Sequence, residues 1–150
     1  MFTMRKLRHW LSKIIRYTVV FYYRQMGINI GKNVFISVGA WLDVRRGKIV
    51  IGDNVTITNG CKILSHDRAA SLLGNAKNGQ KTTIIGKRVF LGMNSIILPG
   101  IEIGDNSIIG AGSVISKNIP PGCVVVGSRP RIIKRLNEAS GEWSSVDEVL

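Results

Sequence analysis

An aliphatic residue recurs at every sixth position along most of the chain, and a glycine or polar residue often follows it. The longest unbroken run opens its six-residue blocks at Ile85, Leu91, Ile97, Ile103, Ile109 and Ile115. The same frame occurs earlier, at Ile30, Ile36 and Leu42 and again at Ile51, Ile57 and Ile63. A repeat of this length predicts an all-β fold, a parallel β-helix built as a hexapeptide solenoid.

Three blocks make about one coil, so equivalent residues are expected to stack about every 18 positions, with Ile85 beneath Ile103. The first-position aliphatics then point inward and form the core. Fifth-position residues, among them Cys61, Val89 and Ser95, are small or medium and are expected to be buried near the corners. Glycine and asparagine at the second to fourth positions favour tight turns between short strands.

The six-residue frame breaks twice. Leu42 and Ile51 are nine positions apart, so Arg45-Arg46-Gly47-Lys48 is expected to bulge. Ile63 and Ile85 are 22 positions apart, four more than one coil, and this stretch begins with Ser65-His66-Asp67-Arg68. Its glycine and asparagine content and its lack of periodicity predict an exposed loop over 67–82. Binding residues concentrate on loops that project from a rigid scaffold.

The N-terminal residues 1–26 are expected to form a basic amphipathic helix. Residues 1–29 contain six Lys and Arg and no Asp or Glu. At helical spacing Leu7, Leu11, Ile14, Thr18 and Phe21 share one face, while Lys6, His9, Lys13 and Arg16 share another. Such a helix either lies in a membrane interface through residues 5–24 or packs as a cap across the open end of the solenoid. We expect the membrane contact; the longest uncharged run, Tyr17 to Tyr23, is too short to span a bilayer.

The composition indicates one domain with anionic partners. The 150 residues include 21 Lys and Arg against nine Asp and Glu, a net charge of +12. The two cysteines, Cys61 and Cys123, have no CxxC spacing, so neither a disulfide framework nor a metal site is expected, and the setting is predicted to be cytoplasmic. The helix adds an expected peripheral location on the inner face of the membrane.

The solenoid is expected to occupy residues 27–127 and a C-terminal region residues 128–150. Within that region, Arg131–Leu136 is predicted to form a short basic helix. The acidic tail beyond it has few apolar anchors and is expected to be mobile.

The most specific segment covers residues 99–120 and reads PGIEIGDNSIIGAGSVISKNIP. On this segment the chain resembles the hexapeptide-repeat acyltransferases, in particular their maltose/galactoside O-acetyltransferase-like and polysaccharide O-acetyltransferase branch, over about residues 27–135. The resemblance implies a left-handed coil and a homotrimer with active sites between subunits. It also implies transfer of an acetyl group from acetyl-CoA, without a metal, to a hydroxyl of a sugar or glycan precursor, which the basic helix suggests is lipid-linked.

The same resemblance implies that His66 is the general base, since it stands where the catalytic histidine of such enzymes precedes the loop. An imidazole titrates near neutral pH and is suited to removing the hydroxyl proton as the oxygen attacks the thioester. Asp67, Asp43 and Asn59 are the candidates for orienting the other ring nitrogen. Asp67, the neighbour in sequence, is included with His66 in the predicted catalytic site, although the sequence does not choose among the three.

For the CoA thioester, the resemblance implies contacts from Gly92, Ala111 and Ser116, and the small residues Gly110 and Ala111 would let the pantetheine arm lie along the edge of the rung. It implies phosphate contacts from Lys117, Arg131 and Lys134. Backbone N–H groups in the Leu91-Gly92-Met93 rung would stabilise the oxyanion.

The sequence departs from the family pattern at two places. Phe90 stands where a tryptophan is common, and the usual end motif Gly-Asn-Pro-Ala-Lys appears as Gly127-Ser128-Arg129-Pro130-Arg131. The shifted proline leaves open which basic side chain contacts the phosphates of CoA. The resemblance does not identify the acceptor molecule.

Two other functions stay open: an acetyltransferase for serine, an amino sugar or an antibiotic, and a non-catalytic basic scaffold or binding module. Nucleic acid is not an expected partner, because the aromatic residues are spread through the rungs and no nucleic-acid motif occurs. A γ-type carbonic anhydrase needs three histidine ligands, whereas this chain contains two histidines.

Overall fold

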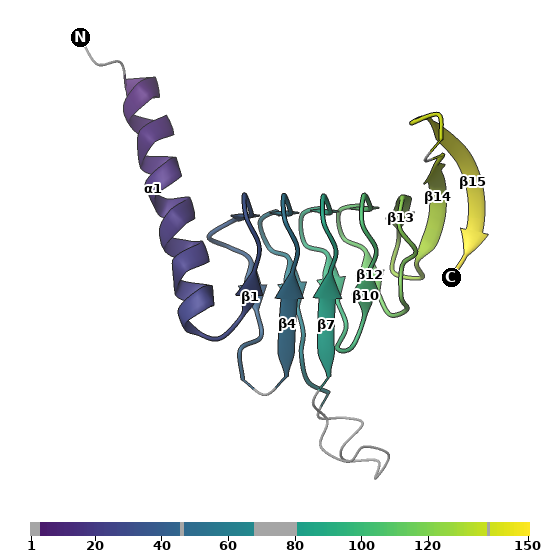
Figure 1. Cartoon of the computed structure of the whole chain (residues 1–150), viewed down its shortest axis with the longest axis horizontal. Coiled ribbons are helices and arrows are strands. Elements are labelled where there is room, and N and C mark those ends of the chain that lie inside the picture. The colour runs from purple at the N-terminus through teal and green to yellow at the C-terminus, as the bar shows by residue number, and fades with distance from the viewer. Residues whose placement is uncertain (1–3, 46, 68–80, 138) are drawn as a thin grey trace.

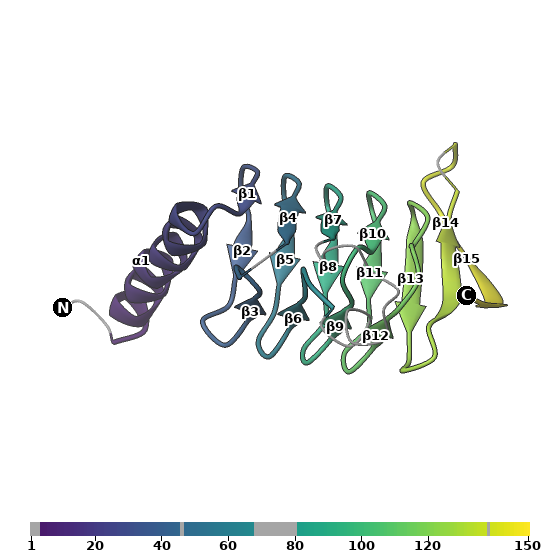
Figure 2. The ribbon, with the colours of Figure 1, turned by 90° about the horizontal axis from the view of Figure 1, so that it is seen from below.

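The computed structural model of the chain describes residues 4–45, 47–67, 81–137 and 139–150. Helix α1 (Met4–Gln25) lies at one end of a solenoid of short strands, and two longer strands lie at the other end (Figures 1 and 2). The strands are β1 (Asn29–Ile30), β2 (Phe35–Ile36), β3 (Trp41–Leu42), β4 (Lys48–Ile51), β5 (Thr56–Ile57), β6 (Lys62–Ile63), β7 (Thr82–Ile85), β8 (Phe90–Leu91), β9 (Ile96–Ile97), β10 (Glu102–Ile103), β11 (Ile108–Ile109), β12 (Val114–Ile115), β13 (Cys123–Val126), β14 (Arg131–Leu136) and β15 (Trp143–Val149).

The strands of the solenoid form three parallel sheets. Sheet 1 has the order β1-β4-β7-β10, and sheet 3 has the order β3-β6-β9-β12. Sheet 2 begins as β2-β5-β8-β11-β13 and continues into β14 and β15. Ile85 pairs with Ile103 and Leu91 with Ile109, which confirms the predicted stacking and the parallel β-helix.

The repeat accounts for the core and the turns. First-position side chains from Ile36 to Ile115 are at most 2% exposed, and the fifth-position residues Cys61 and Ser95 are fully buried. Fourth-position asparagines adopt positive φ, for example 57° at Asn54 and 58° at Asn106. Asparagine tolerates this left-handed conformation better than most residues, which explains its place in the tight corners.

The long interruption adds no coil. β7 pairs directly with β4, with Ile51 opposite Ile85, so the insertion contributes no rung between these two strands. The ends of the insertion meet where the Lys81 N–H donates to the Ser65 carbonyl at 3.1 Å. The predicted loop over 67–82 falls mainly on residues 68–80, which lie outside the described residues, as does Arg46 of the predicted bulge.

The last turns of α1 cap the first coil. Tyr23 is buried, and its hydroxyl donates to the Ala40 carbonyl at 3.1 Å and accepts from the Leu42 N–H at 3.3 Å. Val19 and Val20 pack against the same core. The capping interpretation is therefore confirmed for this end of the helix.

The outer side of α1 remains exposed. Tyr17 and Phe21 are 78% and 63% exposed, whereas the side chains of the predicted basic face, Lys6, His9, Lys13 and Arg16, lie outside the description. Within the described part of the chain, no helix is long and apolar enough to cross a membrane.

The predicted C-terminal helix is wrong. Residues Arg131–Leu136 form strand β14, which pairs antiparallel with β13, and the tail expected to be mobile contributes β15. The last coil leaves β13 with an unpaired edge, and β14 satisfies it while Ile132 is fully buried over the end of the core. Tertiary pairing therefore overrides the helical appearance of a basic, aliphatic segment.

Candidate active site

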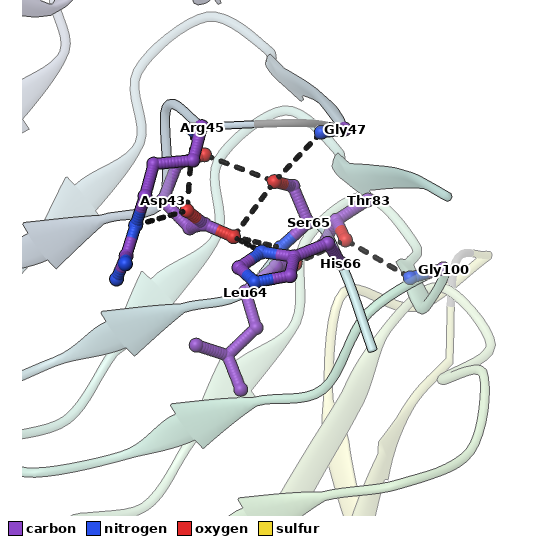
Figure 3. Close-up of polar contacts among 8 residues, drawn as sticks. All are labelled: Asp43, Arg45, Gly47, Leu64, Ser65, His66, Thr83 and Gly100. Carbon is purple, nitrogen blue, oxygen red and sulfur yellow. Dashed lines mark hydrogen bonds and ion pairs between the residues drawn. The ribbon is translucent and has the colours of Figure 1, made fainter. Parts of the chain in front are cut away.

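His66 lies beside Asp43 in the neighbouring coil. Strands β3 and β6 pair in register in sheet 3, and these two residues follow them in the turns leading out of that sheet. Asp43 Oδ2 is hydrogen-bonded to His66 Nδ1 (Figure 3). Of the three candidates for orienting the imidazole, the structure thus brings Asp43 to this nitrogen. A catalytic role for Asp67, which follows His66 in the chain, stays a prediction.

The Asp43 carboxylate is buried, at 1% exposure, and is held by several donors. Oδ2 also accepts from the Ser65 N–H at 3.3 Å and the Ser65 hydroxyl at 3.0 Å, while Oδ1 accepts from the Arg45 N–H at 3.2 Å. Burial alone raises the pKa of Asp43, but the hydrogen bonds from His66, Arg45 and Ser65 outweigh it and hold that pKa below its usual value. Asp43 is therefore a carboxylate at neutral pH.

An ionised Asp43 dictates the proton position on His66. The carboxylate can only accept, so Nδ1 carries a proton and the neutral ring has its lone pair on Nε2. The His66 side chain is 25% exposed, in contrast to the fully buried Asp43 side chain. The pair thus has the geometry of a partly exposed histidine oriented by a buried carboxylate, an arrangement that suits proton transfer.

The main chain around this pair is fixed by polar side chains of adjacent coils (Figure 3). The Gly47 N–H donates to Ser65 Oγ at 3.2 Å, and a Cβ at Gly47 would lie 1.9 Å from the Ser65 carbonyl oxygen. Thr83 Oγ1 donates to the Leu64 carbonyl at 2.6 Å and accepts from the Gly100 N–H at 3.0 Å. Sequence reasoning missed Ser65 and Thr83, although a hydroxyl residue next to the base was a usable signal.

A guanidinium flanks the other side of the Asp43 carboxylate. Arg45 Nε lies 3.7 Å from Oδ1, and Arg45 Cζ lies 5.6 Å from the centre of the Trp41 ring. The Arg45 side chain is 68% exposed and Trp41 is 40% exposed. Sequence reasoning placed Arg45 in a bulge and gave Trp41 no role.

The predicted CoA-binding residues lie at two corners of the prism. The turns that follow sheet 3 form one corner, here called the dyad corner, which contains Asp43 and His66. Two coils beyond His66, the same corner contains the exposed residues Ser116 and Lys117. The glycine corner, formed by the turns from sheet 2 to sheet 3, contains Gly92 and Ala111 and ends near Arg131, which pairs with Val126. Lys134 lies farther along β14, opposite Val124.

Gly92 has a structural reason to be glycine. A Cβ there would lie 2.5 Å from the Ala111 nitrogen, so the two coils stack this closely because no side chain intervenes. The Gly92 N–H donates to the Ile109 carbonyl at 2.8 Å. This donor belongs to the ladder between coils, so the Gly92 N–H expected to serve the oxyanion is already engaged.

The cations of β14 meet carboxylates of β15. Arg131 Nη2 lies 2.7 Å from Asp147, and the Arg135 guanidinium binds Glu148 at 2.5 and 2.9 Å. The Arg135 hydrogen bond lowers the pKa of Glu148. A phosphate group would thus have to share Arg131 with Asp147, a constraint that the sequence did not reveal.

A model of the family described as bacterial transferase hexapeptide (six repeats) matches residues 82–117. Galactoside O-acetyltransferase of Escherichia coli (strain K12) is 34% identical over 121 residues, which cover 79% of this chain and 59% of that protein. The chain thus spans less than two thirds of this relative's length. The putative lipopolysaccharide biosynthesis O-acetyl transferase WbbJ of the same organism is 31% identical, over 87% of this chain and 83% of that protein.

The fold also has close solved counterparts. A galactoside acetyltransferase in complex with coenzyme A superimposes with a TM-score of 0.59 and 26% identity, over 81% of this chain and 72% of that one. Such neighbours are left-handed β-helices, which confirms the predicted fold class, apart from the C-terminal helix corrected above.

The lowered pKa of Asp43 predicts a pH-dependent effect of Asp43→Asn on stability. A depressed carboxyl pKa stabilises the fold at pH values above the ordinary value of 3.8 and loses that contribution as pH falls through the lowered value. Urea unfolding should therefore show a deficit of about 1–3 kcal/mol for Asp43→Asn at neutral pH that shrinks below pH ~4. Glu102→Gln, which removes an exposed carboxylate, is the control. A deficit that stays constant or grows on acidification would contradict the assignment.

Proposed function

This chain belongs to the hexapeptide-repeat acetyltransferases, and on that premise we propose that it transfers an acetyl group from acetyl-CoA to a hydroxyl of a sugar or glycan precursor. The observation that carries the proposal is the buried Asp43 carboxylate bound to His66 Nδ1 at the dyad corner. A relative named for lipopolysaccharide biosynthesis supports a glycan acceptor in particular.

In the proposed reaction, His66 Nε2 takes the proton of the acceptor hydroxyl as the oxygen attacks the thioester carbonyl carbon. The new C–O bond gives a tetrahedral oxyanion, which collapses with cleavage of the C–S bond. The imidazolium then returns its proton to the departing CoA thiolate. Asp43 stabilises the imidazolium and keeps the ring in the tautomer that accepts at Nε2.

We place the acetyl-CoA site between subunits of a homotrimer. Ser116 and Lys117 share the dyad corner with His66, whereas Gly92, Ala111 and Arg131 belong to the glycine corner. A three-sided prism allows the glycine corner of one subunit to face the dyad corner of the next. Lys117, Lys134 and the shared Arg131 would then contact the phosphates. A related galactoside acetyltransferase solved in complex with coenzyme A supports binding of this cofactor.

We also propose that α1 holds the enzyme at the cytoplasmic face of an anionic membrane, where a lipid-linked acceptor is available. The exposed side of α1 contains an open groove of about 440 Å³. It is lined by Ile14, Tyr17, Thr18, Val20, Phe21 and Arg24. Aromatic and aliphatic side chains beside basic residues are typical of helices that lie in a membrane interface, and residues 1–29 contain no acidic residue.

For the catalytic proposal, His66→Ala should lower the rate of acetyl transfer at least about a hundredfold because no base remains for the hydroxyl proton. CoA affinity, measured by calorimetry, and oligomeric state should be unchanged. Asp43→Asn should cost more activity than Asp67→Asn. A near-normal rate in His66→Ala would overturn the assignment, and a larger loss in Asp67→Asn would move the orienting role to Asp67.

For the membrane proposal, the double substitution Tyr17→Ser and Phe21→Ser should weaken binding to phosphatidylglycerol vesicles by about tenfold or more. Both side chains are exposed, so the cap at Tyr23 is left intact, which deletion of residues 1–26 would not achieve. Val38→Ser, at a solenoid position that is 69% exposed, is the matched control. Unchanged co-sedimentation of the double variant would rule out this surface.

A further inference from the structure

An exposed guanidinium and an exposed indole lie next to the proposed base. Arg45 contacts Oδ1 of the Asp43 carboxylate and His66 contacts Oδ2, so both side chains flank the same buried group (Figure 3). Arg45 also lies over the Trp41 ring, with Cζ 5.6 Å from its centre. A cation–π contact of this kind restrains a side chain that is otherwise free in solvent.

Asp43 does not depend on the Arg45 guanidinium. The carboxylate already accepts from the Arg45 main-chain N–H, from the N–H and hydroxyl of Ser65, and from His66. The additional contact to Arg45 Nε is long, at 3.7 Å, and the side chain is 68% exposed, so the ion pair contributes little to stability. Figure 3 shows Nε toward Asp43 and the two Nη groups pointing away from it.

The surroundings of Trp41 are basic as well as exposed. Lys62 is its partner in the register of β3 and β6, and both residues are exposed on the outer face of sheet 3. Paired residues of a parallel sheet project to the same side, so the Lys62 side chain leaves the sheet beside the indole. Positive charge thus gathers at the outer side of the dyad corner.

We propose that Arg45 binds an anionic group, a carboxylate or a phosphate, on the sugar acceptor and so places a neighbouring hydroxyl at His66. The guanidinium offers a planar pair of donors that matches either group and discriminates against a neutral sugar. Trp41 acts as a positioning residue that holds the guanidinium over its ring. This inference rests on the proposed acetyl transfer and adds the acceptor class, an acidic sugar.

The experiment compares three acceptors that differ at C6: glucose, glucuronate and glucose 6-phosphate. The full-length enzyme should acetylate at least one charged sugar with a kcat/KM about ten- to a hundredfold above that for glucose, mainly through KM. Arg45→Gln should abolish this preference, so that the charged sugars are acetylated with a kcat/KM close to that for glucose. Lys32→Gln removes one exposed positive charge from the first coil, away from the dyad corner, and should keep the preference.

Glucuronate and glucose 6-phosphate distinguish a carboxylate from a phosphate as the bound group. Equal kcat/KM for all three sugars, or an unchanged preference in Arg45→Gln, would overturn the inference while acetyl transfer itself still stands. Absence of transfer to any acceptor together with absence of CoA binding would instead refute the proposed function.

A binding measurement without catalysis gives a second readout. The chain contains three tryptophans, so replacing Trp10 and Trp143 by Phe leaves Trp41 as the fluorophore. A charged sugar that binds Arg45 should change Trp41 emission at concentrations at least about tenfold below those needed for glucose. Arg45→Gln in this background should remove the difference. A response to glucose as strong as that to both charged sugars would contradict the proposal.

Discussion

Each coil of the solenoid is held to the next by main-chain hydrogen bonds in a fixed register, and the chemistry depends on that register. Successive side chains of a strand point to opposite sides, so a slip of one residue would exchange the buried and exposed sets. The pairing of Leu42 with Ile63 puts Asp43 and His66 in the same corner of two adjacent coils. A buried carboxylate thereby reaches the imidazole from a residue 23 positions away.

Some charged side chains of this scaffold are paired within the fold, and others are largely exposed to solvent. Asp43 is fully enclosed by donors, and Arg131 and Arg135 are paired with the carboxylates of β15. The Arg45 guanidinium, in contrast, contacts Asp43 only at 3.7 Å, and the Arg45 side chain is mostly exposed to solvent. Some basic side chains thus hold β14 to β15 at the C-terminal end of the solenoid, whereas Arg45 lies exposed at the dyad corner.

The six-residue repeat was sufficient to predict the solenoid, its buried columns and its asparagine turns, because each rung imposes the same local geometry. His66 became the candidate base through the family resemblance, which places the histidine just before the interruption of the frame. The choice of Asp43 was beyond sequence reasoning, since the nine-residue break between Leu42 and Ile51 separates β3 from β6 and the register across it follows from tertiary packing. Asp67, adjacent in sequence, was the easier expectation.

The C-terminal region shows where local reasoning fails. Arg131–Leu136 has the composition of a short basic helix, and short segments carry too little periodicity to decide between helix and strand. This segment is a strand because it pairs with the otherwise unpaired edge of β13 and because Ile132 is thereby buried. Gly92 shows the reverse case, since a residue assigned to a ligand also has a close contact between coils that requires glycine.

The central claim is that Asp43 fixes the proton of His66 on Nδ1 and leaves Nε2 to act as the base. Nitrogen-15 NMR of histidine-labelled protein tests it directly, with His9→Gln leaving His66 as the single histidine of the chain. At a pH where the ring is neutral, the account predicts a protonated Nδ1 and an unprotonated Nε2, with the proton populating both nitrogens in Asp43→Asn. A proton on Nε2, or a tautomer mixture that Asp43→Asn leaves unchanged, would contradict it.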